Sequence, residues 1–257
     1  MHNSKILAID KYHKGSRFSN KYGEWFTVLE YEDHGNVTIL FDIDKLPRVV
    51  KSKDINRECL RAKNAITIAG IACLGEGPYE AADSFGKPHK PYKLFRHMLD
   101  RCYTEAYRKK NMNYADCSVL PVWYNYQNFA AWYYEQPGKD IGSFQLDKDL
   151  TGSRVYGPEF CYFIPKVINS TLRTVAEKKN IDLPRGVSLS LGTKLPYVST
   201  YRDIGSTRLE RFLTINEARS HYVECTKSKL INVAKSYGSD LHPNVVTLLE
   251  EYDWDNL

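Results

Sequence analysis

The segment from residue 145 to residue 169, QLDKDLTGSRVYGPEFCYFIPKVIN, constrains the fold more than any other part of the chain. LDKDL has period-two character, TGSR has the composition of a turn, and YGPEFCYFIP is rich in aromatic and β-branched residues. This pattern predicts a strand, a loop and a second strand. KVINSTLRTVAEKK then has apolar residues at helical spacing and a basic last turn, which predicts a helix. The segment should therefore fold as a small ββα unit.

The residues of this unit resemble the finger of HNH endonucleases. That family has Asp-His at the end of the first strand, a Gly-Asn loop, Pro-Glu-Asn-Leu in the second strand and an Asn or His early in the helix. Lys148 stands at the position of the catalytic His, Ser153 at the loop Asn and Phe160 at the central Asn. The matching positions are Asp147, Gly152, Pro158, Glu159 and Asn169.

The resemblance implies a divalent cation, Mg²⁺ or another, held by Asp147 and Asn169. Such a cation neutralises charge on the scissile phosphate while the histidine deprotonates water. A lysine with its ordinary pKa of roughly 10.4 is a poor base near neutral pH. The candidate catalytic residues are Lys148 and Asp147, assisted by His89 or His97. The alternative is that residues 147–149 are a charged strand end that makes surface pairs.

Upstream, residues 92–108 have the pattern of an amphipathic helix with a basic face. Its apolar residues are Leu94, Phe95, Met98, Leu99 and Cys102. A basic helix face is most often only solvated, but beside a nuclease finger it is a candidate phosphate track. The candidate DNA-binding residues here are Arg96, Arg101, Arg108, Lys109 and Lys110.

The whole region from residue 92 to residue 134 resembles the segment upstream of this finger in phage-encoded homing endonuclease-like proteins. Its aromatic residues are dense enough to suggest base stacking. Core packing is the more common outcome for aromatic residues at helical spacing. The residues shared with the family are Phe95, Met98, Leu99, Arg101, Cys102, Tyr103, Cys117, Ser118, Val119, Trp123, Phe129 and Trp132.

Residues 183–237 resemble the Apetala/ethylene-response type of DNA-binding domain, in which three antiparallel strands are followed by a helix. The matching residues are Pro184, Gly186, Val187, Phe212, Glu217, Ala218, Tyr222 and Lys227. Thr214 and Glu217 have the spacing of a capping box at the start of that helix. Such a sheet can lie in the major groove. The candidate contacts are Arg185, Lys194, Tyr201, Arg202, Arg208 and Arg211, and the alternative is a scaffold with ordinary surface arginines.

Near the N-terminus, EWFTVLEYEDHGNVTILFDI has the pattern of a hairpin with a His-Gly-Asn turn. This region resembles the small barrel with which phage homing-type proteins often begin, which implies a small β-barrel over residues 1–62. Residues 63–91 are rich in Gly and Pro and read as a linker. This stretch lacks the lysine-serine ending of a phosphate-binding loop.

Bulk composition sets further limits. The chain has 257 residues, a net charge of +5 and an acidic ending, EEYDWDNL, so the middle is more basic than the total suggests. No apolar run approaches the roughly 18 residues of a membrane span, so we expect no membrane partner and a cytoplasmic protein of an infected bacterial cell. Six cysteines without a C-x-x-C pair suit reduced core thiols. A mixed zinc site from Cys117, Cys161 and a histidine is the less favoured alternative.

The expected fold is therefore α+β: a small N-terminal β-barrel (1–62), a linker (63–91), a central HNH-like ββα-metal finger with a helical flank (92–180), and a C-terminal three-stranded sheet plus helix (181–257). The expected partner is double-stranded DNA. Three functions stay open. The first is a metal-dependent DNA endonuclease of the phage HNH homing type. The second is a degenerate DNA-binding regulator that does not cleave DNA, and the third is a module that binds a host protein.

Overall fold

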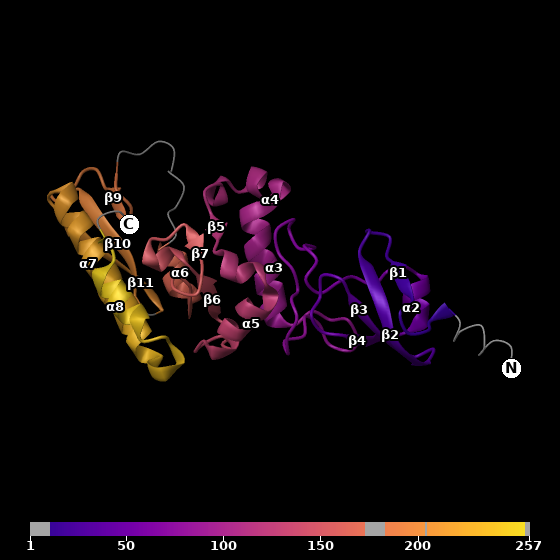
Figure 1. The fold of residues 1–257 in the computed structure, drawn as a ribbon. Coiled ribbons are helices and arrows are strands. Elements are labelled where there is room, and N and C mark those ends of the chain that lie inside the picture. The colour runs from indigo at the N-terminus through magenta and orange to yellow at the C-terminus, as the bar shows by residue number, and fades with distance from the viewer. Residues whose placement is uncertain (1–10, 173–182, 204, 255–257) are drawn as a thin grey trace. The chain divides into compact units, whose positions relative to one another are not determined.

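The computed structural model describes residues 11–172, 183–203 and 205–254, which form a mixed α+β fold with several small sheets (Figure 1). The chain divides into two compact units, residues 1–132 and residues 133–257. The expected α+β class is confirmed, whereas the finer division into four domains stays a prediction. None of the described helices is both long and apolar enough to cross a membrane.

The first unit begins with a four-stranded antiparallel sheet and continues with helices. Its elements are β1 (Arg17–Ser19), β2 (Trp25–Asp33), β3 (Asn36–Phe41), β4 (Arg48–Val50), α2 (Ser52–Asn56), α3 (Lys90–Tyr103), α4 (Glu105–Lys110), η1 (Met112–Tyr114), β5 (Ser118–Val119), η2 (Pro121–Tyr124) and α5 (Tyr126–Glu135), the last of which continues into the second unit.

The predicted hairpin is confirmed, but the predicted closed barrel is wrong. Strands β1 to β4 pair in chain order, and within the described residues β4 does not pair with β1. The two outer strands have only three residues each, which is too short to close a barrel. One face of the open sheet is instead covered by Ile55 of α2 together with Tyr12, Ala62 and Ala65.

The predicted linker has few regular elements but packs against the rest of the unit. Its regular pairing within residues 63–89 is limited to isolated bridges. Gln127 of α5 holds it, because its side-chain amide donates to the carbonyls of Leu74 (3.3 Å) and Tyr79 (3.0 Å) and accepts from the Tyr79 N–H (3.0 Å). Ala65, Ile68 and Ala72 are buried. The segment is therefore an ordered part of the first unit.

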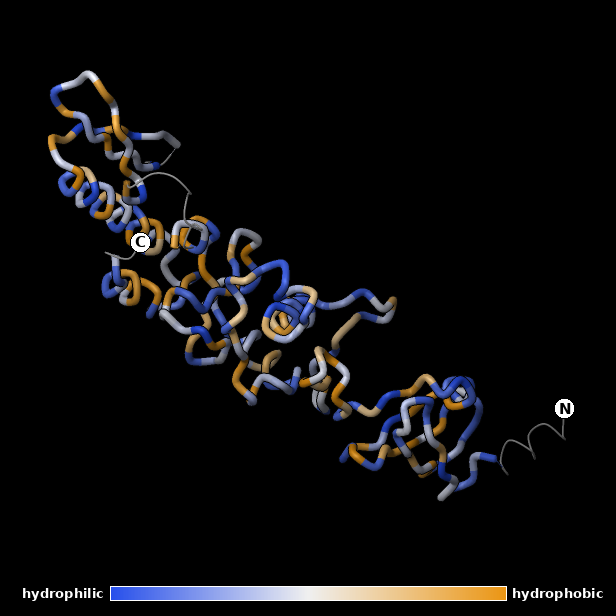
Figure 2. Tube along the Cα trace, turned by 90° about the horizontal axis from the view of Figure 1, so that it is seen from above, coloured by the Kyte–Doolittle hydropathy of each residue, from blue (hydrophilic) through white to orange (hydrophobic). Residues whose placement is uncertain are grey.

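The amphipathic helix is present but shorter than the sequence pattern predicts. Helix α3 ends at Tyr103, and Thr104 is extended before α4 begins. Phe95, Met98, Leu99 and Cys102 are fully buried, as expected. Figure 2 views this helix nearly along its axis and shows hydrophobic residues on one side and hydrophilic residues on the other.

Most of the aromatic residues after this helix form the core. Trp123, Tyr126, Phe129 and Tyr133 are each no more than 1% exposed. The rings of Trp123 and Phe129 pack edge to face with centroids 5.1 Å apart. Only Tyr134 among the aromatic residues of this run is a large exposed side chain. Core packing, rather than base stacking, therefore explains most of this run.

The second unit contains the ββα segment and the C-terminal sheet. Its elements are β6 (Phe144–Asp147), η3 (Asp149–Thr151), β7 (Val155–Tyr156), β8 (Tyr162–Pro165), α6 (Lys166–Leu172), β9 (Val187–Leu189), β10 (Tyr197–Asp203), β11 (Ser206–Phe212), α7 (Ile215–Ser236), η4 (Gly238–Asp240) and α8 (Asn244–Glu251). Strands β6 and β8 pair antiparallel, and α6 follows β8 directly. The predicted strand, loop, strand and helix are confirmed up to Leu172, while residues 173–182 of the predicted helix lie outside the described residues.

The C-terminal part also follows the expected order of three strands and a helix. The strands form an antiparallel sheet in the order β11-β10-β9, and α7 comes next. The predicted capping box is confirmed, since the Glu217 N–H donates to Thr214 Oγ1 at 3.3 Å and the Thr214 N–H donates to Glu217 Oε2 at 3.0 Å. Ala218, Tyr222 and Leu230 of α7 are buried.

Candidate functional site

The ββα segment brings Asn169 beside the first strand. The Asn169 side-chain N–H donates to Gln145 Oε1 at 3.0 Å. Gln145 and Asp147 are two residues apart on β6, so their side chains leave the same face of the hairpin. The predicted metal-binding pair, Asp147 and Asn169, therefore faces the same side of β6.

Asp147 is buried and already has a main-chain partner. Asp147 is 5% exposed, and its Oδ2 accepts a hydrogen bond from the Leu150 N–H at 2.9 Å. Burial raises the pKa of this carboxyl to about 6, a shift that the Leu150 N–H opposes. In this position the carboxyl caps the turn that leads from β6 into the loop.

Lys148 is buried too, with 3% of its surface exposed. Its ammonium forms an ion pair with Asp149 and lies 5.4 Å from the centroid of the Tyr156 ring. An ammonium in an ion pair has no lone pair with which to accept a proton from water. Lys148 therefore serves here as a buried cation that is satisfied by Asp149 and Tyr156.

The metal ligands that the resemblance implies here are Asp147 and Asn169. In the part of the chain that the structure describes, no group of three His, Cys, Asp or Glu side chains could hold a metal ion. The same finding applies to the mixed zinc site suggested for Cys117 and Cys161. The six cysteines are free thiols, of which Cys102, Cys117 and Cys161 are buried. The Mg²⁺ site stays a prediction, and we route no chemistry through it.

The other finger positions shape the loop. Gly152 has a φ of 72°, a left-handed conformation that suits glycine and ends η3. Ser153 Oγ accepts from the Val155 N–H at 2.9 Å, so it braces the loop. Glu159 is exposed and Pro158 is half-buried. His89 and His97 belong to the first unit.

The C-terminal sheet has two distinct faces, which its register defines. Ser199 Oγ lies 3.1 Å from His221 Nδ1, and Glu210 Oε2 lies 3.0 Å from His221 Nε2, so the face of Ser199 and Glu210 packs on α7. Side chains alternate along a strand and register partners share a face. The face turned away from α7 therefore carries Ser188, Val198, Thr200, Arg202, Thr207, Leu209 and Arg211.

We call this second face the open face. Val198 at its centre is 7% exposed and Thr200 is half-buried, and the end with Arg202 and Thr207 also borders a cleft lined by α7. Its other residues are exposed, and its charged residues are cationic. Arg202, Arg211, Ser188 and Thr207 are exposed, and Leu209 is 68% exposed. No carboxylate belongs to the seven described residues of the open face, because Glu210 is on the α7 side. Arg211 is the register partner of Val198, four residues before Arg202. The two arginines are thus about 13 Å apart along the strand direction at roughly 3.3 Å per residue.

The other predicted DNA contacts of this domain are placed differently. Arg208 is the register partner of Tyr201 and shares its face, which is the α7 side. The Tyr201 ring packs against His221 with centroids 5.5 Å apart. Arg185 precedes β9 and is half-buried, and Lys194 is exposed in the turn between β9 and β10. The structure therefore separates the predicted set and brings only Arg202 and Arg211 onto the open face.

The predicted DNA contacts of the first unit differ in their surroundings. Arg96 and Lys110 are exposed. Arg101 lies 5.6 Å from the Tyr114 ring centroid, the Arg108 guanidinium donates to the Ala115 carbonyl, and Lys109 pairs with Glu105 at 2.6 Å. Three of the five predicted DNA contacts on α3 and α4 thus have local partners.

Sequence reasoning missed His221. Its contacts to Ser199 and Glu210 have the atom types of a serine hydrolase triad, but Ser199 is 0% exposed, so no substrate can reach its hydroxyl. The group instead joins α7 to the sheet. The sequence gives only a weak signal for this cluster, because Ser199, Glu210 and His221 follow one another at intervals of 11 positions.

No family model, no curated protein and no solved structure matches this chain. The function must therefore be argued from the site.

Proposed function

We propose that this chain is a double-stranded DNA-binding protein whose open face, on β9, β10 and β11, contacts DNA, and that its finger does not hydrolyse the bound DNA. The proposal includes descent from phage homing endonuclease-like proteins, which accounts for the order of the finger and the C-terminal domain. Its place of action would be the cytoplasm of an infected bacterial cell, where phage and host DNA are present.

The observation that carries the proposal is the pair of exposed arginines, Arg202 and Arg211, on a sheet face whose described residues have no carboxylate. Their separation of about 13 Å is close to the roughly 12 Å width of the major groove. Arginine is also the residue best suited to bidentate contacts with guanine or phosphate. Between residues 183 and 214 there are five basic and two acidic residues, so the local charge favours a polyanion.

Burial of the finger's functional positions argues against hydrolysis. A catalytic metal must touch the scissile phosphate, and a general base must reach the attacking water. Asp147, Lys148 and Asn169 are 5%, 3% and 7% exposed and are engaged by Leu150, Asp149 and Gln145. These residues support the fold of the finger, which leaves DNA binding as the function that the geometry favours.

The binding test uses fluorescence anisotropy with a labelled duplex of about one and a half helical turns over a series of salt concentrations. Leu209→Glu places a carboxylate in the middle of the open face, and Arg211→Gln removes one cation from it. We expect Leu209→Glu to abolish most binding. Arg211→Gln should weaken binding and reduce the slope of log K against log salt by about 0.9.

Arg208→Gln is the matched control, because it makes the same charge change on the same strand but on the α7 side. It should change affinity less than twofold. Binding should persist in chelator. If wild-type protein shows no salt-dependent binding, or if Leu209→Glu binds as well as wild type, the proposal fails.

A separate assay tests the absence of hydrolysis. Wild-type protein is incubated with supercoiled plasmid and Mg²⁺ or Mn²⁺, and we expect the plasmid to remain intact. Nicking that disappears in Asp147→Ala would show that the finger is a nuclease and would overturn this part of the proposal.

A further inference from the structure

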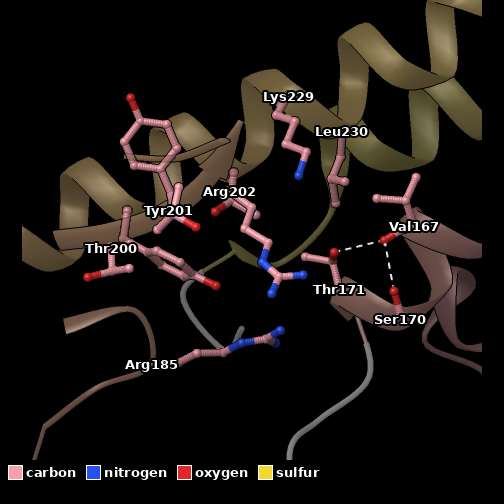
Figure 3. Close-up of a pocket in the computed structure, with 12 residues that line it drawn as sticks. Val167, Ser170, Thr171, Arg185, Thr200, Tyr201, Arg202, Lys229 and Leu230 are labelled. Atoms are coloured by element: carbon pink, nitrogen blue, oxygen red, sulfur yellow. Dashed lines mark hydrogen bonds between the residues drawn. The ribbon is translucent and has the colours of Figure 1, made fainter. Parts of the chain in front are cut away.

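The second unit has a cleft lined by α6, β10 and α7. Its volume is about 470 Å³, within the roughly 300–1,000 Å³ range of small-ligand pockets. Figure 3 shows the Arg202 guanidinium inside it, between the Arg185 side chain and the Lys229 ammonium. Arg202 and Lys229 also line an adjoining cleft of about 420 Å³ together with Gly205, Ser206 and Thr207.

The lining of this cleft has the chemistry of an anion site. Cationic side chains come from the loop before β9 (Arg185), from β10 (Arg202) and from α7 (Lys229). None of the described lining residues of either cleft has a carboxylate. The remaining polar residues are hydroxyls, from Ser170, Thr171, Thr200, Tyr201, Thr207, Tyr222 and Thr226.

Two of these hydroxyls have their protons engaged. Thr171 Oγ1 donates to the Val167 carbonyl at 2.8 Å and Ser170 Oγ donates to the same carbonyl at 3.3 Å, as the dashed lines in Figure 3 mark. Donors for a ligand therefore come chiefly from the cations and from hydroxyls of the sheet and α7. Thr226 is 6% exposed and lies on the wall of the cleft.

Arg202 and Lys229 have no ion-pair partner among the described acidic side chains. Two cations that share a cleft repel one another, and a bound anion with several oxygen atoms removes that repulsion while accepting hydrogen bonds from both. We propose that this cleft is a phosphate-binding site, with Arg202 and Lys229 as its principal ligands.

The phosphate could belong to a free phosphorylated metabolite or to the backbone of a nucleic acid, since both offer the same oxygen atoms. The site shares Thr200, Arg202 and Thr207 with the open face, whereas Lys229 of α7 lies outside that face. The inference therefore does not depend on DNA binding by the open face. A substitution of Lys229 tests the phosphate site and leaves every residue of the open face unchanged.

Titration calorimetry with inorganic pyrophosphate, at constant ionic strength in chloride buffer, tests the first source. We expect saturable binding to wild-type protein and a loss of affinity of about tenfold in Lys229→Gln. Lys229→Arg should stay within about threefold of wild type because it keeps the charge. Lys235→Gln is the matched control, since Lys235 is on the same helix but pairs with Glu250 and does not line the cleft.

Duplex DNA tests the second source with the same four proteins. A nucleic acid phosphate predicts that Lys229→Gln weakens DNA binding and lowers the salt slope by about 0.9, whereas Lys235→Gln does not. A free metabolite predicts that DNA binding is unchanged while pyrophosphate binding falls. The inference is overturned if pyrophosphate fails to bind wild-type protein and Lys229→Gln also leaves DNA affinity unchanged.

These outcomes are distinguishable from failure of the proposed function. If wild-type protein does not bind DNA at all but binds pyrophosphate through Lys229, the open-face proposal fails and the phosphate site stands. Thermal unfolding supplies a second measurement. Pyrophosphate should raise the melting temperature of wild-type protein and of Lys235→Gln, and should raise that of Lys229→Gln much less.

Discussion

His221 Nδ1 lies 3.1 Å from Ser199 Oγ, and this contact fixes which face of the C-terminal sheet is covered by α7. Ser199 is 0% exposed, so its hydroxyl depends on His221 for a partner. Because Ser199 faces the helix, its neighbours Val198 and Thr200 face the other way. The contact between His221 and Ser199, on the α7 side of the sheet, therefore identifies the open face as the opposite side.

The first prediction concerns this pair. His221→Ala should lower the free energy of unfolding by about 1–3 kcal/mol, because it leaves the buried Ser199 hydroxyl without its partner. Glu210→Gln is the control. Its side chain is 58% exposed and the change should alter stability by less than about 0.5 kcal/mol. Urea unfolding followed by circular dichroism measures both, and equal losses in the two variants would contradict the anchoring role.

The second prediction concerns the pH dependence contributed by Asp147. Burial raises its folded-state pKa to about 6, above the unfolded value. Below the unfolded-state pKa of about 3.9 the carboxyl is protonated in both states, and the folded protein has its full stability with respect to this group. As the pH rises through the folded-state pKa, the buried carboxyl must ionise and that stability is lost. The loss is on the order of 3 kcal/mol between pH 4 and pH 7.

Asp147→Asn should therefore remove this part of the pH dependence, because an amide can still accept from the Leu150 N–H without a charge. Unfolding by urea at several pH values between 4 and 8 gives the difference between wild type and variant. Glu159→Gln, which removes an exposed carboxyl between β7 and β8, is the control for the change of charge. A variant that follows the wild-type profile would show that Asp147 is not buried in solution.

The third prediction separates the two members of the Lys148 and Asp149 pair. Lys148→Met should be neutral or slightly stabilising, since it replaces a buried ammonium with an apolar chain of similar size. Asp149→Asn should destabilise by about 1–3 kcal/mol, because it leaves that ammonium without its carboxylate. Thermal unfolding compares them. The reverse order would favour a solvent-exposed Lys148, as a catalytic role requires.

The fourth prediction compares two glycines with positive φ. Gly152 and Gly186 have φ values of 72° and 82°. An added Cβ meets nothing within 4 Å at Gly152 but comes 2.1 Å from the Tyr222 ring at Gly186. Gly152→Ala should cost about 1–2 kcal/mol from backbone strain alone. Gly186→Ala should cost clearly more, because the ring must also move, and similar values for the two would contradict the close approach of β9 to α7.

Several features of the fold were predictable because they depend on neighbouring residues. The hairpin of β2 and β3, the capping box of Thr214 and Glu217, and the strand, loop, strand and helix between residues 144 and 172 all follow from local pattern and turn chemistry. The buried face of α3 follows from helical spacing in the same way. These elements needed no knowledge of distant parts of the chain.

The closed barrel was the main error in the fold. A pattern of alternating residues predicts that strands exist, but closure depends on whether the first and last strands are long enough to pair. Tyr12, Ala62 and Ala65, from outside the strands, cover the face instead. This substitution of loop residues for barrel closure could be found only in three dimensions.

The candidate site shows the same division. The sequence by itself determined which residues are basic and that three strands precede a helix. Only the tertiary structure decided that Arg202 and Arg211 share a sheet face while Arg208 does not, that Asp147 and Lys148 are buried, and that Lys229 and Arg202 line one cleft. The physical reason is that the surroundings of a side chain depend on strand register and on the packing of helices from distant segments. Register and packing are set by the whole core, and not by the neighbours of that residue in the sequence.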